Sequence, residues 1–394
     1  MQLTGRPPLW SRDFILLLGI SFTFYMGFHM LLAPMPLYVV HLGGTEASAG
    51  LVTGLFTLTA MIVRPLTGWA LDVYGRRAVL LLGTVFCLAL IITHQWAATL
   101  GVLIVLRMVH GLGFGFATTA GGALAADLVP RSRLGEGMGI YAVAMGLPLA
   151  VAPAVGIWLA GRGQFSTLFA LAAGVTALSL ALALILRVPR PARVRTVGVR
   201  ARVASMFVRE AVFPSALMFL LISSFGLILA LLAIFGRERG VESVGAWFTL
   251  YAVVLTLSRA LAGRASDRFG YAETAAVGFV FVVAGLLVMA SAHSSWVLLT
   301  SAVVYGIGYG SAQPSLQAML VARTPAVRIG AATALFFLAY DLGTTVGSVG
   351  GGFLAAVVGL GSVFALSAVA PALALILLIA HTRRARRRTA GAAY

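Results

Sequence analysis

One carboxylate in this sequence lies where a carboxylate is costly. Asp341 falls about twelve residues into an apolar stretch that runs from 329 to 356, whereas the other acids lie in polar segments or at the ends of such stretches. A carboxylate inside an apolar medium is stable only when it is protonated or paired with a cation. Asp341 is therefore a candidate for proton transfer, with contact to a substrate cation and a structural bond between helices as the alternatives.

Arg107 is the cation that lies at a comparable depth. It stands about eight residues into an apolar stretch, some 12 Å along a helix that rises 1.5 Å per residue. A guanidinium at that depth costs about 3 kcal/mol or more when unpaired, so it must face a cavity or a partner. We expect it to pair with Asp341, and a bond to backbone carbonyls is the alternative. Arg64 and Arg259 lie nearer the ends of their stretches and can extend to the interface, so we expect their role to be mainly structural.

Polar residues at four-residue spacing form two further stripes. A spacing of four puts side chains on one face of a helix, and polar residues in a span usually face the protein interior. A simple hydrogen bond between helices explains each residue taken singly. The stripes consist of Tyr25 and His29 near the N-terminus, and of Tyr305, Tyr309, Gln313 and Gln317 in the second half.

The elements that carry these residues are long apolar helices. Sixty per cent of the 394 residues are hydrophobic, 10% are charged, and the mean hydropathy is +1.01. Each apolar stretch is long enough to cross about 30 Å of hydrocarbon, which indicates an all-α membrane protein. We predict twelve transmembrane helices, at 14–40, 48–71, 78–97, 99–125, 136–160, 165–187, 211–235, 244–265, 273–292, 296–321, 329–356 and 360–381.

The chain is a tandem duplication with a period of 195 residues. Four residues in the segment 64–75 recur in identical form, and a glycine-rich segment at 110–115 lies over its counterpart at 305–310. A parallel repeat of this size predicts two pseudo-symmetric six-helix bundles, 1–187 and 211–394, joined by a basic linker at 188–210. The four pairs are Arg64 and Arg259, Gly68 and Gly263, Asp72 and Asp267, and Gly75 and Gly270.

The distribution of positive charge predicts the orientation. All 28 basic residues are arginine, and 22 of them fall on one side if the spans alternate. The opposite side carries Arg162, Arg237 and Arg239. By the positive-inside rule, both termini face the cytoplasm of a multi-pass protein in the inner (plasma) membrane, and the basic runs contact anionic lipid at most weakly. Such a distribution does not indicate nucleic-acid binding.

Missing residue types exclude several chemistries. Without lysine, the chain has no phosphate-binding loop of the GxxxxGK[ST] type and no lysine Schiff base. One cysteine, Cys87, forms no intrachain disulfide, and the six histidines stand in no metal-binding spacing. We therefore expect no cofactor, no metal site and no enzymatic activity.

Several motifs resemble the major facilitator superfamily. Residues 68–77, with sequence GWALDVYGRR, look like the loop signature between helices 2 and 3, and RMVHGLGFG at 107–115 resembles the helix 4 signature. Residues 148–157 resemble the helix 5 antiporter signature. This segment retains the proline and one glycine of the signature as Pro153 and Gly156, and it has Pro148, Ala152 and Ile157 in place of three other glycines. Residues 54–65 and 154–158 look like the drug-efflux branch, and more narrowly the exporters of opine-type metallophores such as staphylopine.

The resemblance implies a major facilitator fold and alternating access. In that family helices 1, 4, 7 and 10 line the pathway, which would bring both stripes and Arg107 around one cavity. The implied function is proton-coupled export of small amphipathic or zwitterionic molecules by a monomer, with protons and membrane lipid as its other partners. A metabolite importer or uniporter is the alternative, and a membrane-embedded enzyme or receptor would need a catalytic set or signalling domain that the sequence lacks.

A cluster of charges near the repeated loop is a candidate conformational latch. Gly68 permits a close approach of helices, and Asp72 can accept hydrogen bonds at the start of the next helix. We expect the cluster to hold one side of the transporter shut, and a static structural clasp is the alternative. Its members are Gly68, Asp72, Gly75, Arg76, Arg77, Asp127 and Arg133, with Asp267 as the acid of the second copy.

Overall fold

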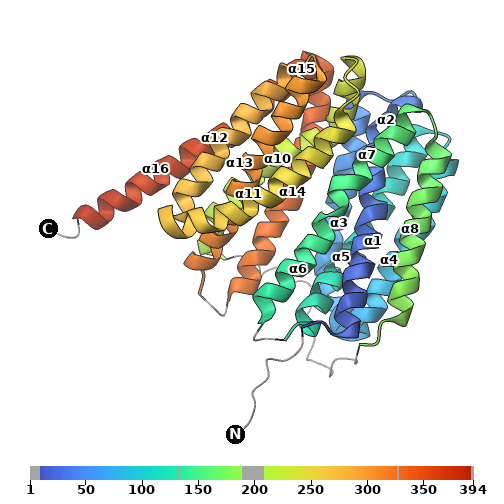
Figure 1. The fold of residues 1–394 in the computed structure, drawn as a ribbon, viewed down its shortest axis with the longest axis horizontal. Coiled ribbons are helices and arrows are strands. Elements are labelled where there is room, and N and C mark those ends of the chain that lie inside the picture. Colours follow the sequence, from blue (N-terminus) through green and yellow to red (C-terminus); the bar gives the residue numbers. More distant parts are fainter. Residues whose placement is uncertain (1–8, 131–132, 189–207, 326–327, 392–394) are drawn as a thin grey trace, which may run out of the picture. The chain divides into compact units, whose positions relative to one another are not determined.

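A computed structural model describes residues 9–130, 133–188, 208–325 and 328–391 of the chain, and every element in these ranges is a helix (Figure 1). Most of the linker expected at 188–210 thus lies outside the described residues. The helices of the first half are α1 (Arg12–Leu32), α2 (Met35–His41), α3 (Glu46–Tyr74), α4 (Arg76–Thr93), the 3₁₀ helix η1 (His94–Trp96), α5 (Leu100–Leu128), α6 (Leu134–Gly146), α7 (Pro148–Gly161) and α8 (Phe165–Ile185). Those of the second half are α10 (Arg209–Glu238), α11 (Val244–Phe269), α12 (Tyr271–Ala290), α13 (Ser295–Arg323), α14 (Ile329–Val358), α15 (Leu360–Ser367) and α16 (Val369–Gly391).

Helices occupy all twelve predicted spans. Eleven described segments are long and apolar enough to cross a membrane, and α13 supplies the predicted span at 296–321 with 29 residues and a more polar composition. Three predicted spans are each formed by two helices in series, α1 with α2, α6 with α7, and α15 with α16. Pro34, Pro148 and Pro371 lie at or just after these breaks, because proline lacks the N–H that a continuous helix needs.

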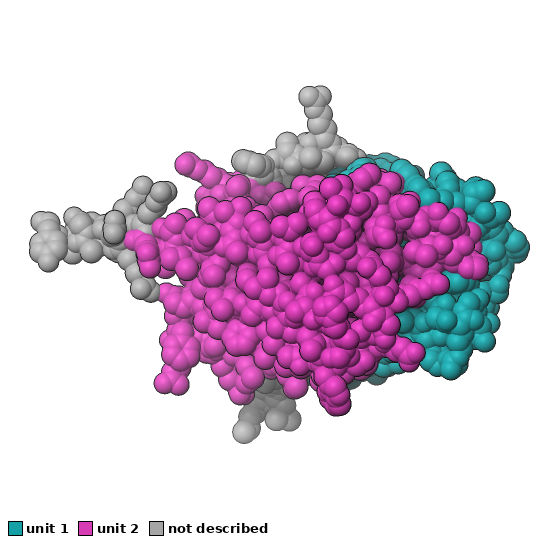
Figure 2. All heavy atoms as spheres, turned by 90° about the horizontal axis from the view of Figure 1, so that it is seen from above, with its two compact units in different colours: residues 1–34, 58–202 teal, residues 35–57, 203–394 magenta. Residues whose placement is uncertain are grey.

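The chain forms two compact units, which Figure 2 colours separately. Unit 1 contains Met1–Pro34 and Leu58–Arg202, and unit 2 contains Met35–Thr57 and Val203–Tyr394. In unit 1, α1 packs against α5, α6, α7 and α8, and α4 packs between α5 and α8. In unit 2, α10 packs against α13, α14 and α16, and α13 packs against α11 and α12.

Residues 35–57 belong to unit 2, although the repeat assigns them to the first half of the sequence. Here the start of α3 lies very close to α14, since a Cβ atom on Gly54 would come within 2.9 Å of Ser348 Oγ. A Cβ atom on Gly352 would come within 2.6 Å of the carbonyl oxygen of Glu46. The Thr345 hydroxyl donates across this contact to the carbonyl oxygen of Gly54 at 3.4 Å. Small residues thus join the two helices backbone to backbone.

The repeat is visible in helix packing. In unit 1, a Cβ on Gly83 of α4 would come within 2.9 Å of the Gly113 carbonyl of α5. In unit 2, the equivalent Gly278 of α12 meets the Gly308 carbonyl of α13 at 2.8 Å. Both pairs are separated by the 195-residue period, so glycine is needed at each place for the same close approach of two helices.

The repeated loop also has one conformation in both halves. Gly75 ends the loop between α3 and α4 with φ 87°, and Gly270 does the same between α11 and α12 with φ 100°. These angles lie in the region that side chains with a Cβ rarely adopt. A glycine at each position therefore lets one helix end and the next begin almost immediately.

Candidate functional site

Asp341 is buried in the middle of α14. It is the thirteenth of the 30 residues of α14 and exposes 5% of its surface. The surrounding turns of α14 pack closely on α10, because Gly226 of α10 lies against the backbone of Thr344. The Thr345 hydroxyl donates to the Asp341 carbonyl oxygen at 2.9 Å, so the backbone here is bonded within the helix. The structure thus places a buried carboxylate near the middle of α14.

Tyrosines of the predicted stripe form the centre of an aromatic cluster in unit 2. The rings of Tyr305 and Tyr309 stack with centroids 6.1 Å apart, and Phe225 of α10 lies 5.7 Å from Tyr309. From α11, Tyr251 lies 5.8 Å from Tyr305 and stacks on Trp247 at 5.2 Å. The cluster holds the two stripe tyrosines in fixed positions between three helices.

The polar side-chain atoms of this cluster differ in their hydrogen bonding. Tyr305 Oη lies 2.9 Å from Ser224 Oγ, and Trp247 Nε1 donates to Ser301 Oγ at 2.9 Å. Tyr309 exposes 3% of its surface, and its hydroxyl has no hydrogen-bond partner within the described part of the chain. The cluster therefore contains a buried hydroxyl that is free to bond.

Arg64 and Arg259 each reach the neighbouring helix of their own unit. Arg259 Nη2 of α11 donates to Gln313 Oε1 of α13 at 2.8 Å. In unit 1, Arg64 Nη1 of α3 lies 3.5 Å from Thr119 Oγ1 of α5. The two contacts occupy nearly equivalent places in the repeat. The sequence suggested that these arginines extend to the interface, and it did not indicate these partners.

Arg107 is fully buried inside unit 1. Its Nη1 lies 3.5 Å from His110 Nδ1, one turn further along α5, and the rings of His110 and His94 make an edge contact at 5.6 Å. The guanidinium thus lies beside two histidines within one bundle. Asp341 belongs to unit 2, and its pairing with Arg107 stays a prediction.

Tyr25 and His29 face the other members of a second aromatic cluster in unit 1. Their rings stack with centroids 6.0 Å apart, and both contact Phe28. Phe114 of α5 joins the cluster and lies 6.1 Å from Tyr25. Phe114 is the repeat equivalent of Tyr309, so each unit has an aromatic cluster at the same place on its own helix pair.

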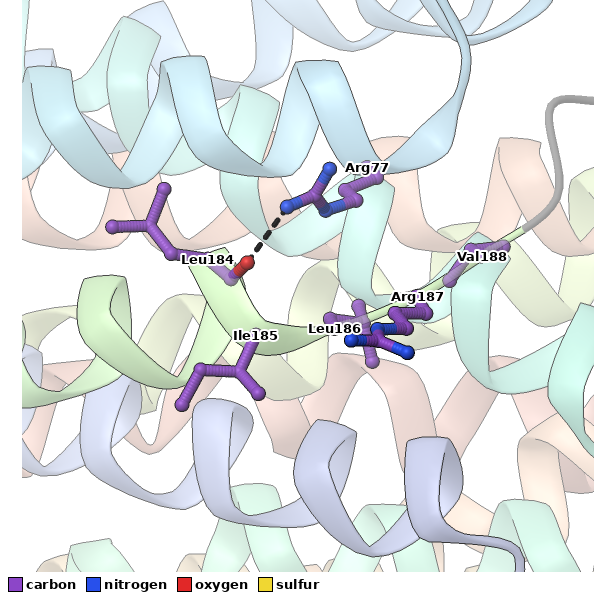
Figure 3. A pocket seen from close by; sticks show the side chains of 6 residues that line it. All are labelled: Arg77, Leu184, Ile185, Leu186, Arg187 and Val188. Atoms are coloured by element: carbon purple, nitrogen blue, oxygen red, sulfur yellow. Dashed lines mark hydrogen bonds between the residues drawn. The ribbon is translucent and has the colours of Figure 1, made fainter.

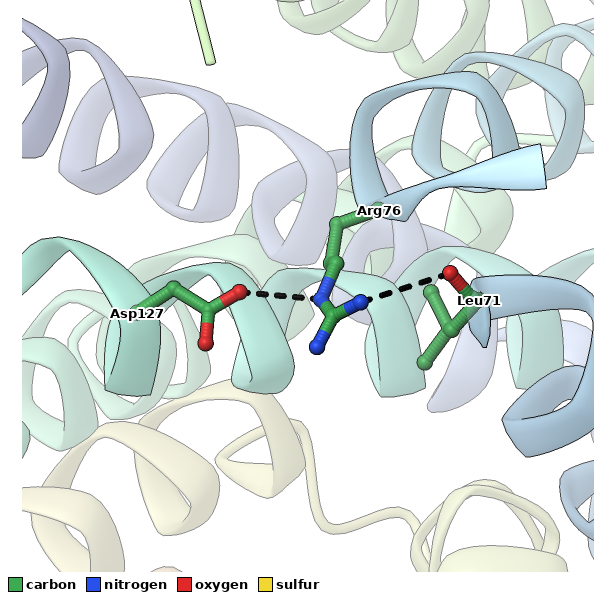
Figure 4. A network of polar contacts seen from close by, with 3 residues as sticks. All are labelled: Leu71, Arg76 and Asp127. Atoms are coloured by element: carbon green, nitrogen blue, oxygen red, sulfur yellow. Dashed lines mark hydrogen bonds and ion pairs between the residues drawn. The ribbon is translucent and has the colours of Figure 1, made fainter. Parts of the chain in front are cut away.

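The candidate latch contains one ion pair in the described structure. Arg76 Nε, at the start of α4, donates to Asp127 Oδ2, at the end of α5, over 2.9 Å, and Arg76 Nη1 donates to the Leu71 carbonyl at 3.5 Å (Figure 4). Both partners belong to unit 1, so the pair joins helices of one bundle. The side chains of Asp72 and Asp267 lie outside the described part, and Arg133 is the N-cap residue of α6.

Arg77 lies in a different environment from its neighbour. It donates from Nη2 to the Leu184 carbonyl near the end of α8 at 2.7 Å, beside an open pocket of about 530 Å³ (Figure 3). Residues Leu184–Val188 form the rest of this pocket, and Asp13 Oδ1 of α1 accepts from the Arg187 amide at 3.1 Å. Arg77 thus bonds an exposed carbonyl at a helix end, a role that its spacing in the sequence did not indicate.

The helix 5 signature contains a break between two helices and a close helix contact. Pro148 begins α7 directly after α6 ends, and Pro153 lies inside α7. Gly156 lies against the carbonyl oxygen of Met30, so a side chain there would clash with α1. The residues retained from the signature therefore set the approach of α7 to α1.

Known proteins share this architecture over the whole chain. An uncharacterized MFS-type transporter of Methanocaldococcus jannaschii is 23% identical over 373 residues, which cover 92% of this chain and 94% of that protein. An uncharacterized MFS-type transporter of Burkholderia mallei is 28% identical over 394 residues, with 95% and 94% covered. The crystal structure of a POT family transporter bound to a thioalcohol-conjugated peptide superimposes with a TM-score of 0.80 at 14% identity, covering 95% of this chain and 96% of that one.

The family profile agrees with the fold and with the repeat. It matches twice, at residues 17–242 and 215–393, and together these matches span almost the whole sequence. The two matches begin 198 residues apart, close to the 195-residue period of the sequence repeat. The chain is a multi-pass membrane transporter that belongs to the Major Facilitator Superfamily.

Proposed function

We propose that this transporter is proton-coupled and exports small amphipathic or zwitterionic molecules by alternating access. The observation that carries the proposal is the buried position of Asp341 in the middle of α14. A carboxylate enclosed among apolar helices is stable when protonated, and exposure to water on one side favours its ionised form. Because the chain lacks lysine and hence a phosphate-binding loop of the usual type, the energy comes from an ion gradient, from the substrate's own gradient or from a separate ATPase subunit. Asp341 favours the ion gradient.

Arg107 is the proposed partner of Asp341 during the cycle. Proton arrival at Asp341 would release the pair, and loss of the proton would restore it. This exchange requires the two units to change their relative position, which is the motion that alternating access demands. In the family, helices 1, 4, 7 and 10 line the pathway, and these correspond to α1, α5, α10 and α13. The residues proposed to line the substrate cavity are Tyr25, His29, Arg107, Tyr305, Tyr309, Gln313 and Gln317.

The direction of transport rests on the helix 5 signature. Pro153 and Gly156 support an antiporter of the drug or metallophore type, and Gly156 makes the close contact that such a signature requires. The replacement of three glycines, by Pro148, Ala152 and Ile157, favours the alternative of a metabolite importer or uniporter. Counterflow in proteoliposomes with an imposed pH gradient separates the two, because only an antiporter accumulates substrate against the direction of proton flow.

The latch remains part of the proposal. Arg76 and Asp127 already form a pair within unit 1, and Asp72 stands one turn before Arg76 in the repeated loop. We expect Asp72→Asn to leave folding intact and to shift the population toward the state that is open on the arginine-rich side. Spin-label distances across that face would test this, and unchanged distances with unchanged transport would leave only a structural clasp.

The experiment that tests the function has two steps. A thermal-shift screen of the purified protein against drugs, amino-acid conjugates and metallophores first selects a ligand. Transport of that ligand is then measured in proteoliposomes with and without a pH gradient. Accumulation that requires the gradient supports the proposal, and equilibration that ignores the gradient contradicts proton coupling.

A further inference from the structure

Arg259 is exposed although it lies within a membrane-spanning segment. It stands sixteenth in the 23-residue span Val244–Ser266, about seven residues and some 10 Å along the helix from the nearer end. A guanidinium that extended to the interface would run along its own helix toward that end. Instead, its Nη2 bonds sideways to Gln313 of α13. The charge is thus held at the seam between two helices.

The bond to Gln313 orients the amide of that side chain. Arg259 donates to Oε1, which is the acceptor atom of the amide. The Nε2 group of Gln313 therefore remains as a donor of two hydrogen bonds, and the guanidinium keeps further N–H groups. Arg259 and Gln313 together present donors, and a group that accepts hydrogen bonds is their natural ligand.

Tyr309 adds a third donor on the same helix face. It precedes Gln313 by four residues on α13, so the two side chains follow one another along one stripe. Its hydroxyl is buried without a hydrogen-bond partner in the described residues. A buried hydroxyl without a partner is costly, and the cost is offset when a ligand binds it.

The aromatic cluster fixes this hydroxyl in place. Phe225 and Tyr251 pack against the Tyr309 ring with centroids 5.7 and 6.4 Å away. Because neighbouring rings hold the Tyr309 ring, the position of its hydroxyl is set before a ligand binds. The site is therefore pre-organised, which lowers the cost of binding a ligand.

We propose that Arg259, Gln313 and Tyr309 of unit 2 recognise an anionic group, and that the transported molecule carries a carboxylate there. Three donors, one of them permanently charged, match a carboxylate, which only accepts hydrogen bonds. The inference rests on the transporter function proposed above and narrows its substrate class. A zwitterionic substrate meets the requirement through its acidic end.

Binding of matched pairs of probes tests the charge requirement. Benzoate, hippurate and 1-naphthoate would be compared with their uncharged primary amides, by thermal shift and tryptophan fluorescence of the full chain in lipid-free detergent. At least one carboxylate should bind about tenfold or more tightly than its amide, because hydrogen bonds to a charged group are stronger than neutral ones. Equal binding of carboxylates and amides, or no binding of any carboxylate, would overturn the proposal.

Variants then assign the binding to this site. Arg259→Gln should weaken carboxylate binding about tenfold. Arg264→Gln is the matched control, since Arg264 is an exposed arginine five residues further along the same helix, and binding to this variant should stay unchanged. Equal binding by the wild type, Arg259→Gln and Arg264→Gln would show that the anion binds elsewhere.

A second variant covers the case in which Arg259→Gln fails to fold. Gln313→Glu preserves the shape of the side chain and places an internal carboxylate where the ligand's carboxylate would bind. This variant should fold, because it pairs the guanidinium with an opposite charge, and it should lose carboxylate binding. Full carboxylate binding by a folded Gln313→Glu protein would contradict the proposal.

A phospholipid phosphate presents similar chemistry from another source. Dioleoylphosphatidylglycerol added to the detergent sample distinguishes the two. If Arg259→Gln reduces stabilisation by this lipid and leaves carboxylate binding intact, the site holds a lipid, and the substrate assignment is wrong. These binding measurements use no gradient. Their failure is therefore distinct from a failure of proton coupling, which would leave carboxylate binding unchanged.

Discussion

Two tyrosines on one helix face should respond in opposite directions when their hydroxyl groups are removed. Tyr305 and Tyr309 are both buried, lie four residues apart on α13 and share the same aromatic cluster. They differ in that Tyr305 Oη bonds Ser224 Oγ at 2.9 Å, whereas Tyr309 Oη has no partner in the described residues. The substitution to phenylalanine is the same at both places, so each variant is the control of the other.

The expected magnitudes follow from these contacts. Tyr305→Phe removes one hydrogen bond between helices and should lower the free energy of unfolding by about 0.6–1 kcal/mol. Ser224 is not left unsatisfied, because its hydroxyl also donates to the Leu221 carbonyl at 2.8 Å. Tyr309→Phe loses no hydrogen bond and removes the cost of a buried unpaired hydroxyl, so it should raise the free energy of unfolding by about 1 kcal/mol.

Apparent melting temperatures of the ligand-free protein measure the difference. The two variants should melt on opposite sides of the wild type, and each shift should be about 1–2 °C for a protein of this size. One heating rate must be used throughout, since membrane proteins of this kind commonly unfold irreversibly. If Tyr309→Phe lowers the melting temperature as much as Tyr305→Phe does, the Tyr309 hydroxyl is bonded in the native protein. The anion site would then lose one of its three donors.

Three further outcomes test the fold and the topology. Gly270→Ala should lower the free energy of unfolding by about 1 kcal/mol or more, because φ there is 100°. Gly263→Ala should raise the free energy of unfolding slightly, because Gly263 lies inside α11 with open space around it. Equal effects of the two variants in thermal unfolding would contradict the loop conformation. Arg76→Gln should cost at most about 1 kcal/mol, since the side chains of the Arg76–Asp127 pair are 23% and 46% exposed. A larger loss in denaturant titration would mean that Arg76 has partners besides Asp127 and the Leu71 carbonyl. A fluorescent protein fused after Tyr394 should fold and fluoresce if that end is cytoplasmic. An enzyme reporter that is active only outside the cytoplasm should be inactive at the same position. The reverse pattern would invert the proposed orientation.

The sequence predicted the helices well because hydropathy alone decides which segments can span a bilayer. The 195-residue period also identified Gly75 and Gly270, whose equal backbone conformations explain why both are glycine. Residues that lie one period apart can therefore be expected to have the same backbone conformation in both halves. The span at 296–321 was predicted like the others, from the length of its apolar stretch, and α13 forms it.

Contacts between distant residues could not be predicted in the same way. The stripe on α13 was visible in the sequence, yet Trp247 and Tyr251 of α11 gave no sign that they would pack on Tyr305. Arg259 was interpreted as reaching the interface, because the sequence does not show that Gln313 lies within bonding distance. Likewise, the loop motif placed Arg76 in one cluster with several acids, and the structure shows that it bonds Asp127. Each of these pairings depends on how helices rotate against one another, which residue spacing does not determine.

We propose that Asp341 couples transport to protons, and the variant Asp341→Asn tests this role. Asparagine resembles the protonated acid permanently, so the variant should bind substrate but cannot release a proton. Gradient-driven accumulation and gradient-free counterflow would be measured side by side in the same proteoliposomes. We expect Asp341→Asn to lose gradient-driven accumulation of substrate and to keep substrate binding and counterflow. If Asp341→Asn still accumulates substrate against its gradient, Asp341 is not the proton carrier.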